Sequence, residues 1–395
     1  MSYGFFYKRL EQLAVKEFPG LTGAPPVTWD HLVSPIEIRL PKVLLANVEA
    51  AVRALHAVSR RPGYAALLEP VPGISDANVQ HESVLMAYDF HSNEDGDCFL
   101  VEVNTNASGF LLASMMELAH SGQAPTDFVP LKSLRASFER ELHLAGKSGK
   151  RIAICDEDIL QQKMYGEFVM YRDWFRAAGW DAEFCEARDF QVNGETLQAP
   201  GFGEVDLVYN RLTDFYLQQP QHSALREAHR RGLACLSPNP REYWLLGDKQ
   251  RLIQLAAPGF LESTGATPEE CAAVRKVLIP TFEVSAFPSA DDIWQQRRGL
   301  FFKPKRSHGG KSVYRGESVS RKVFERLMHE EILIQHFTPA QKVPVDDPRS
   351  VLNTWKFDLR FYVYADQIQL CAARIYQGQV TNFASPLGGF TKVQF

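Results

Sequence analysis

The chain has 395 residues, of which 45% are hydrophobic and 23% are charged, and its formal net charge is −4. A chain of this length can form two or three domains, each with its own core. The near-neutral charge balance gives no reason to expect nucleic acid or a membrane surface as a partner. The composition therefore excludes strongly basic or acidic protein classes, and it does not decide between a monomer and a homodimer.

Six cysteines are spread along the chain without any C-x-x-C spacing. Most of them stand in apolar runs, which is typical of reduced thiols in the core of a cytosolic protein. The N-terminus has no basic segment followed by an apolar run, and no stretch approaches the roughly eighteen apolar residues of a membrane span. These features predict a cytoplasmic protein.

Residues 1–85 are predicted to be mainly helical. The clearest segment begins at Pro41, and proline is favoured at the first helical position because its missing N–H would have no partner there. The apolar residues that follow at the spacing of one helix face are Leu44, Val48, Val52 and Leu55. This periodicity predicts an amphipathic helix.

Two strands are predicted at 87–91 and 98–103, joined by a turn that contains glycine. Residues two apart on a strand share a face, so Glu102 and Asn104 point the same way, and antiparallel pairing can bring Asp89 beside them. Two carboxylates and an amide oxygen form the hard oxygen site that Mg²⁺ takes with nucleotide phosphates. The alternative is a solvated acidic hairpin, since Asp and Glu are usually exposed.

A short buried helix is predicted over residues 109–120, and a polar linker at 144–151. Strands and amphipathic helices then alternate. The strands are expected at 152–155, 181–185, 205–210 and 233–236, and the helices at 166–178 and 223–231. This alternation predicts a small, mostly parallel sheet, and without a Gly-x-Gly-x-x-Gly fingerprint it predicts no dinucleotide site. We place this domain at 147–242, between an N-terminal region 1–146 and a C-terminal region 243–395.

The C-terminal region begins with a helix-like run at 245–255 that contains Lys249. By itself, such a lysine indicates only a surface charge. Further along, Glu269 and Glu270 stand in a helix whose charged face is expected to be solvated.

An apolar strand then ends at Lys303, and a basic loop with Gly309 and Gly310 follows it. Adjacent glycines let backbone amides approach phosphate oxygens closely, and a lysine supplies a point charge. Loops of this kind also occur by chance in many chains, so the interpretation depends on the neighbouring motifs.

A strand at 332–337 is followed by a strand pair that carries Asp358, Arg360 and Arg374. Arg360 lies near the start of the first strand of this pair and Arg374 near the end of the second, so the two arginines can share one surface. The alternative for each arginine is an ordinary cross-strand ion pair.

In their order, these motifs resemble those of the ATP-grasp ligases. The matching pieces are Asn-Pro before Gly-x-Lys249, Phe-Lys303-Pro before Gly-Gly, an apolar strand with Gln335, Asp358-x-Arg360, Ala-Ala-Arg374 and Thr-Asn382. In that family an Asp and a Glu-x-Asn follow near the C-terminus, whereas here they stand near residue 100. The chain is therefore similar to a circularly permuted ATP-grasp protein, like eukaryotic-type glutathione synthetase and the glutathionylspermidine synthetase group, over residues 83–112 and 150–395.

The resemblance implies an α/β (α+β) fold: a circularly permuted ATP-grasp fold with a small parallel-sheet domain ahead of its lysines. It also implies ATP and Mg²⁺ as cofactors, and a carboxylate–amine ligase that converts a small-molecule acid to an acyl phosphate for attack by an amine. The implied roles are phosphate binding by Lys249, Lys303 and the amides of Gly309 and Gly310, adenine binding by backbone groups near Gln335 and Phe337, magnesium binding by Asp89, Glu102 and Asn104, and charge stabilisation during catalysis by Arg360 and Arg374.

The sequence departs from glutathione synthetase at the motifs that hold the substrate. Ser307 and His308 stand where that enzyme has an acidic residue before a glycine triplet, and Ser108 is the one serine near the Glu-x-Asn motif. The Arg-x-x-Tyr motif appears as Arg211-Leu-Thr-Asp214. These changes leave the fold assignment intact and the substrate open.

Arg211 follows the apolar strand 205–210, at the edge where parallel sheets bind ligands. Because a guanidinium group can hold a carboxylate at two points, we expect Arg211, together with Ser108 and Asn382, to bind an amino-acid or peptide-like acid. The alternative is a structural pair of Arg211 with Asp206 or Asp214.

Two other functions are compatible with this fold. A non-catalytic ATP-binding regulatory or scaffold protein would tend to lose costly clustered carboxylates, which this chain retains. An ATP-grasp phosphotransferase would normally carry a phosphorylatable histidine in a dedicated domain, and none of the eleven histidines stands in an obvious glycine-bounded loop. The sequence names neither the acid nor the amine.

Overall fold

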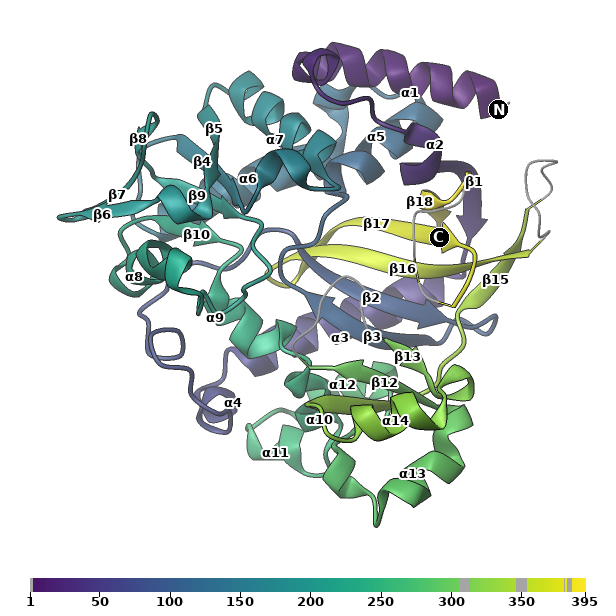
Figure 1. Cartoon of the computed structure of the whole chain (residues 1–395). Helices are drawn as coiled ribbons and strands as arrows, with labels where there is room; N and C mark the ends of the chain where they lie inside the picture. Colours follow the sequence, from purple (N-terminus) through teal and green to yellow (C-terminus); the bar gives the residue numbers. More distant parts are fainter. Residues whose placement is uncertain (1–2, 306–312, 346–353, 380, 382–385) are drawn as a thin grey trace.

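The computed structural model describes residues 3–305, 313–345, 354–379, 381 and 386–395. Its largest sheet has seven strands, in the order β1-β18-β17-β16-β2-β3, with β15 also paired to β16. The strands are β1 (Val33–Arg39), β2 (Met86–Ser92), β3 (Cys98–Asn104), β15 (Gln341–Pro344), β16 (Thr354–Tyr364), β17 (Gln367–Tyr376) and β18 (Gly389–Gln394). Segments from both ends of the sequence therefore share one sheet, which lies at the centre of the molecule (Figure 1).

The central sheet is buried on both faces because side chains alternate along its strands. On β16, Leu359 and Phe361 pack with one set of helices, and Tyr362 and Tyr364 with another. The first set is α3 (Lys42–Ser59), α4 (Pro62–Ala66) and α12 (Pro268–Val277), and the second is α1 (Tyr3–Glu17), α5 (Phe110–Ser121), α6 (Val129–Leu144) and α7 (Tyr165–Ala177). The short helix α2 (Trp29–Leu32) leads directly into β1.

The second sheet is parallel, as predicted, with the order β10-β9-β4-β5. Its strands are β4 (Arg151–Asp156), β5 (Asp181–Glu186), β9 (Leu207–Asn210) and β10 (Cys235–Ser237), and α8 (Ser223–Arg231) packs beside a small ribbon of β6 (Gln191–Asn193), β7 (Thr196–Ala199) and β8 (Gly203–Glu204). The predicted alternation is confirmed for β4, α7, β5, β9, α8 and β10, whereas β6, β7 and β8 were not predicted. Figure 1 shows this region to one side of the central sheet.

A third, antiparallel sheet has the order β11-β14-β12-β13. Its strands are β11 (Thr281–Phe282), β12 (Leu300–Pro304), β13 (Tyr314–Arg315) and β14 (Ile332–His336), and its helices are α13 (Ala290–Gln296) and α14 (Arg321–Leu327). The segment that links the second sheet to the third contains α9 (Pro240–Glu242), a π-helix at Tyr243–Gly247, α10 (Gln250–Ala256) and α11 (Phe260–Ser263). Among the described helices, none is both long enough and apolar enough to cross a membrane.

Residues 1–85 are mainly helical, as predicted, but they also contain β1, which pairs in parallel with β18 at the far end of the chain. Helical periodicity in the N-terminal region cannot reveal a partner strand more than three hundred residues away. One local prediction needs correction: Glu269 is exposed as expected, whereas Glu270 is only partly exposed, because its carboxylate accepts from the Thr267 N–H and from Arg61, both at 2.7 Å.

The parallel sheet is held against the central sheet by Glu141, a fully buried carboxylate on α6. It accepts hydrogen bonds from the Glu82 N–H at 2.9 Å, the Tyr364 hydroxyl at 2.9 Å and the Ser237 hydroxyl at 2.5 Å. These donors come from the segment before β2, from β16 and from β10. One buried anion therefore fixes the relative positions of the elements that carry the candidate site.

Candidate functional site

The hairpin of β2 and β3 forms as predicted, with Asp89 opposite Glu102. Asn104 donates to Asp89 Oδ2 at 3.1 Å and to Glu102 Oε1 at 3.3 Å through the same side-chain nitrogen. The three side chains that the sequence assigned to magnesium therefore converge on one point of the sheet. Because metal ligands must face the phosphate-binding groups, residues 83–112 are expected to lie against the Asp358–Arg374 strands. The structure confirms this, since β2 pairs with β16 and places Asp89 opposite Arg360.

Asp89 is 1% exposed and is surrounded by donors. Arg360 donates to both of its oxygens, at 2.8 Å and 2.7 Å, and Arg374 donates to Oδ2 at 3.0 Å. Burial by itself would raise the pKa of the Asp89 carboxyl, but the charges and hydrogen bonds of the two arginines hold that pKa below its usual value. Asp89 is thus a buried anion that holds the guanidinium groups of Arg360 and Arg374 in place.

Arg374 also donates to Asp358 at 2.6 Å, and Thr381 donates its hydroxyl to the same carboxylate. The two arginines share a surface, as their strand positions predicted. They form the cross-strand ion pairs of the alternative interpretation, and they also line the cavity described below. The structural role and the cavity-lining role are therefore compatible, because these ion pairs lie in the cavity wall.

Lys303 comes from β12 and is 5% exposed. Its ammonium group donates to Gln335 Oε1 at 2.7 Å and to the Val101 carbonyl at 3.2 Å. Burial lowers the pKa of Lys303 to about 8, with Glu102 opposing the shift and Lys249 adding to it. A buried lysine next to acceptors and a second lysine is poised to receive an anion.

We expect nucleotide affinity to fall as the pH rises through about 8. An anion favours the protonated form of Lys303, so binding should raise its pKa above the value in the free protein and take up a proton near pH 8. Calorimetry of ATP binding in buffers with different ionisation enthalpies measures this uptake. Lys303→Gln should abolish it, and a wild-type protein that takes up no proton would separate Lys303 from the nucleotide site.

The residues near the predicted adenine hinge have other partners. Gln335 accepts from Lys303 and donates to Thr281 at 3.1 Å. The Phe337 N–H donates to the Gly299 carbonyl at 2.8 Å, and the Phe337 ring lies against Phe301 and the Arg315 guanidinium group. Gln335 lines the cavity, whereas Phe337 is not among its lining residues. The Phe337 amide could therefore read a base edge only after its bond to Gly299 opens.

Arg211 makes neither of the structural pairs considered for it. Its guanidinium group donates to the Asn106 carbonyl at 2.5 Å and to the Ser108 hydroxyl, and its Nε has no partner among the described residues. Asp206 instead accepts from the Arg151 N–H, and Asp214 pairs with His222. Arg211 thus anchors the loop that follows β3, and this loop lines the cavity.

Glu167, a buried residue on α7 that the sequence did not single out, holds the other end of this loop. Its two oxygens accept from the Gly109 N–H at 2.7 Å and 2.9 Å. Gly109 has a φ of +99°, and a Cβ there would lie 1.9 Å from the Phe390 ring, so only glycine fits. Burial raises the pKa of Glu167 to about 7, although Arg211 and the loop amides oppose the shift.

Because Arg211 anchors a loop that lines the cavity, Arg211→Lys should affect both stability and substrate binding. Lysine keeps the charge but loses the fork that holds Asn106 and Ser108, so we expect a loss of about 1–3 kcal/mol in the free energy of unfolding. The apparent KM for the acid should rise as well, because the displaced loop lines the cavity. Urea denaturation and steady-state kinetics measure the two effects, and an unchanged unfolding free energy would contradict the anchoring role.

Asp156 is a second residue that the sequence did not single out. It ends β4 beside Arg211, lines the same cavity and is 8% exposed. Burial raises the pKa of Asp156 to about 6, with the Glu157 N–H and Arg211 opposing the shift. A signal was present in the sequence, because Asp156 directly follows a strand of the parallel sheet, where ligands bind.

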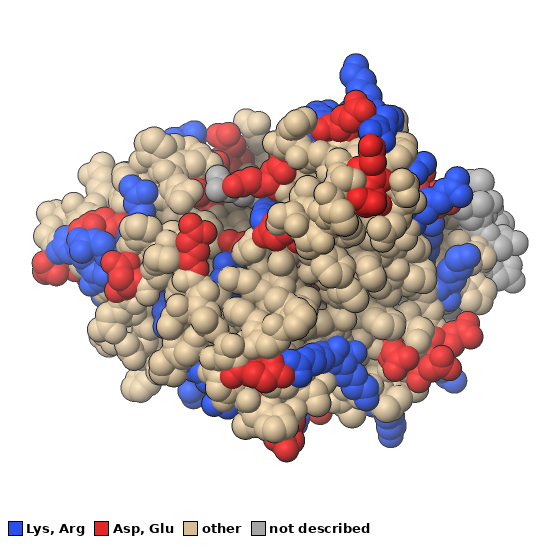
Figure 2. Space-filling view, turned by 90° about the horizontal axis from the view of Figure 1, so that it is seen from below, with Lys and Arg blue, Asp and Glu red and all other residues tan. Residues whose placement is uncertain are grey.

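Most of the side chains described above, though not Glu167 or Phe337, line one cavity of about 760 Å³, within the range of small-molecule sites. Lining residues that the sequence predicted are Asp89, Glu102, Asn104, Ser108, Arg211, Lys249, Lys303, Gln335, Arg360 and Arg374. Gly309, Gly310 and Asn382, as well as Ser307 and His308, lie outside the described residues. On the face seen in Figure 2, acidic and basic side chains are interspersed, so that no single charge dominates it.

No protein-family model and no curated protein sequence matches the chain. Among solved structures, it resembles a glutathione synthetase-like effector from Globodera pallida in its apo form, with a TM-score of 0.55 and 11% sequence identity over 91% of this chain and 89% of that chain. A candidate gamma-glutamylcysteine synthetase from Methylobacillus flagellatus KT gives a TM-score of 0.47 and 11% identity over 79% and 81% of the two chains. The first likeness shows a glutathione synthetase-like fold.

Proposed function

We propose that this chain is an ATP- and magnesium-dependent carboxylate–amine ligase with a circularly permuted ATP-grasp fold. The observation that carries the proposal is the convergence, in one cavity, of an oxygen-ligand set with a buried lysine and two largely buried arginines. The glutathione synthetase-like fold supports the same reaction class. We infer the permutation from the hairpin of β2 and β3, which pairs beside β16 although it precedes the lysines in the sequence.

The residues fit magnesium in part. Glu102 is half-buried, and its hydrogen-bond donor among the described residues is the neutral amide of Asn104, so its oxygens suit a cation. The Asn104 amide would have to turn by half a rotation to present its oxygen. Asp89 already accepts from two arginines and Asn104, so it would contribute only if one of these donors withdrew. Bound magnesium would neutralise phosphate charge at this point.

The proposed reaction has two steps. An oxygen of the acid's carboxylate bonds to the γ-phosphorus of ATP as the bond to ADP breaks, with Lys249 and Lys303 balancing phosphate charge. The amine nitrogen then bonds to the acyl carbon, phosphate leaves with the electron pair of the acyl–oxygen bond, and the nitrogen loses a proton. Arg360 and Arg374 would stabilise the charge that develops on the phosphoryl oxygens.

Arg211 and Asp156 suit an acid with an amino-acid end. They lie side by side at the ends of β9 and β4, and they offer a cation and an anion to a carboxylate and an ammonium group. This pairing favours an amino-acid or peptide-like acid over a simple fatty or aromatic acid.

Mass spectrometry of products tests the proposal directly. The full chain is incubated with ATP, Mg²⁺ and a pooled panel of amino acids, dipeptides and polyamines, with EDTA in the matched control. We expect ADP, phosphate and one new amide whose mass equals acid plus amine minus water. ATP binding without any amide or ADP would instead favour the non-catalytic ATP-binding protein.

A further inference from the structure

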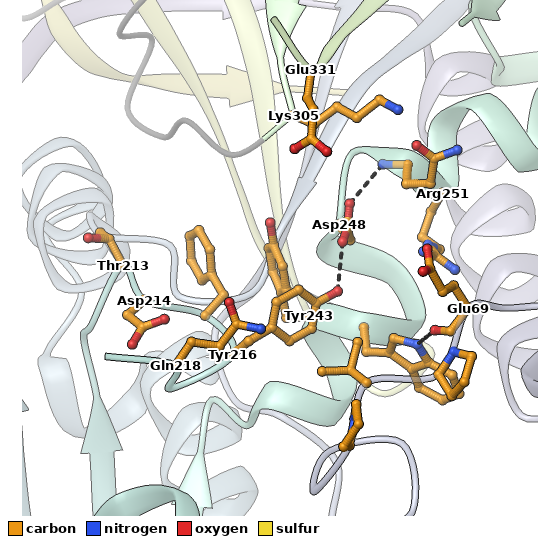
Figure 3. A pocket seen from close by; sticks show the side chains of 16 residues that line it. Glu69, Thr213, Asp214, Tyr216, Gln218, Tyr243, Asp248, Arg251, Lys305 and Glu331 are labelled. Atoms are coloured by element: carbon orange, nitrogen blue, oxygen red, sulfur yellow. Dashed lines mark hydrogen bonds between the residues drawn. The ribbon is translucent and has the colours of Figure 1, made fainter. Parts of the chain in front are cut away.

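A second cavity of about 440 Å³ adjoins the first. The two cavities share Thr213, Phe215 and Tyr243 in their walls. The second is otherwise built by the loop after β9, the segment from the π-helix to α10, residues 69–72 and the ends of β12 and β14 (Figure 3). A molecule in it would therefore lie next to the reacting groups proposed above.

Arg251, on α10, lines this cavity and is only 3% exposed. Its Nε and Nη1 atoms are buried and have no hydrogen-bond partner in the described part of the chain. A buried guanidinium group without acceptors is costly, because it loses hydration and gains nothing in return. In a cavity wall, such a group marks the place of an anionic partner that comes from outside the chain.

The other charged groups of the cavity are already satisfied or solvated. Asp248 accepts from the Tyr216 hydroxyl at 2.6 Å, and Lys305 pairs with Glu283 at 2.8 Å. Asp214 accepts from His222 at 2.8 Å, and the remaining carboxylates of the wall, Glu69 and Glu331, are exposed to solvent. Arg251 therefore stands out as the buried ion of this wall with unused donors.

Four aromatic side chains also line this cavity. Phe215 and Tyr243 stack with ring centroids 4.2 Å apart and an interplanar angle of 11°. Tyr216 and Trp244 add two further rings. Aromatic walls suit a flat or apolar group, and the cavity has room for more than the smallest amino acid.

We propose that the second cavity binds the amine substrate, and that this substrate is an α-amino acid with an apolar side chain whose carboxylate is held by Arg251. Figure 3 shows Arg251 across the cavity from Thr213 and Asp214. A molecule whose carboxylate binds Arg251 would therefore extend toward Thr213, which belongs to the wall shared with the first cavity. The substrate class rests on the proposed ligase function, whereas the carboxylate site rests on Arg251 alone.

Calorimetry with a matched pair of probes tests the site. L-Phenylalanine and L-phenylalaninamide share the ring and the amino group and differ in the carboxylate. We expect the wild-type full chain to bind the acid roughly ten- to one-hundredfold more tightly than the amide, the effect of one charge-assisted hydrogen-bonded pair. Equal affinity for the two probes, or tighter binding of the amide or of spermidine, would overturn the proposal.

Arg251→Gln should remove the preference for the acid, while Arg275→Gln, an exposed arginine paired with Glu262, should retain it. A preference that survives Arg251→Gln would also overturn the proposal. Affinity for a non-hydrolysable ATP analogue, measured on the same samples, tests nucleotide binding independently of the carboxylate site. Arg251-dependent binding of L-phenylalanine without nucleotide binding would keep the site and exclude the ligase.

Discussion

Asp89→Asn is expected to lower the free energy of unfolding by about 3–5 kcal/mol. The asparagine would bring an NH₂ group to the place where an Asp89 oxygen now accepts from Arg360, Arg374 and Asn104. The variant would therefore leave two nearly buried guanidinium groups close together with half of their acceptor lost, and like charges in a buried site repel each other. Urea denaturation at neutral pH measures the loss.

The dependence on pH gives this prediction a second test. Because the folded protein holds the pKa of Asp89 below its usual value, the stability it contributes is present above the pKa of the unfolded chain, about 3.9, and is lost as the pH falls through the folded value. The difference in the free energy of unfolding between wild type and Asp89→Asn should thus be constant near neutral pH and become smaller at acidic pH. Asp95→Asn, in the exposed turn of the same hairpin, is the matched control and should stay within about 0.5 kcal/mol. An Asp89 variant as stable as this control would contradict the role of Asp89 as an organising anion.

Much of the architecture could be predicted because it depends on local periodicity. The strands and helices of the parallel sheet, the hairpin of β2 and β3, and the pair of β16 and β17 each carry their pattern within a short window. The convergence of Asp89, Glu102 and Asn104 followed from the same rule, since residues two apart on a strand share a face. The order of the motifs then placed β2 beside β16, although more than two hundred and fifty residues separate them in the sequence.

What the sequence missed depends on contacts between distant segments. The pairing of β1 with β18 is non-local, and so is the position of Glu167, whose carboxylate holds the Gly109 amide. Arg211 had two acidic neighbours in sequence, yet its partners are Asn106 and Ser108, because the loop after β3 lies closer in space. Arg251 could not be recognised at all, because nothing in the sequence shows that its Nε and Nη1 atoms are buried and lack partners among the described residues.

Glu102→Gln, on the neighbouring strand, also replaces a carboxylate by an amide, as Asp89→Asn does. It should have the opposite effect: little change in stability and a large loss of turnover. Glu102 is half-buried, and its hydrogen-bond donor in the described part of the chain is the neutral Asn104 amide. No guanidinium group therefore loses its counter-ion in the variant, and the free energy of unfolding should stay within about 1 kcal/mol of wild type. Turnover with ATP and Mg²⁺ should fall by a hundredfold or more, on the order of the several kcal/mol that metal-assisted charge stabilisation supplies. Binding of Mn²⁺ followed by electron paramagnetic resonance gives a readout besides activity, and its affinity should fall in parallel. Wild-type turnover or unchanged Mn²⁺ binding in Glu102→Gln would remove Glu102 from the metal site, and a loss of stability as large as that of Asp89→Asn would show that both carboxylates serve the fold.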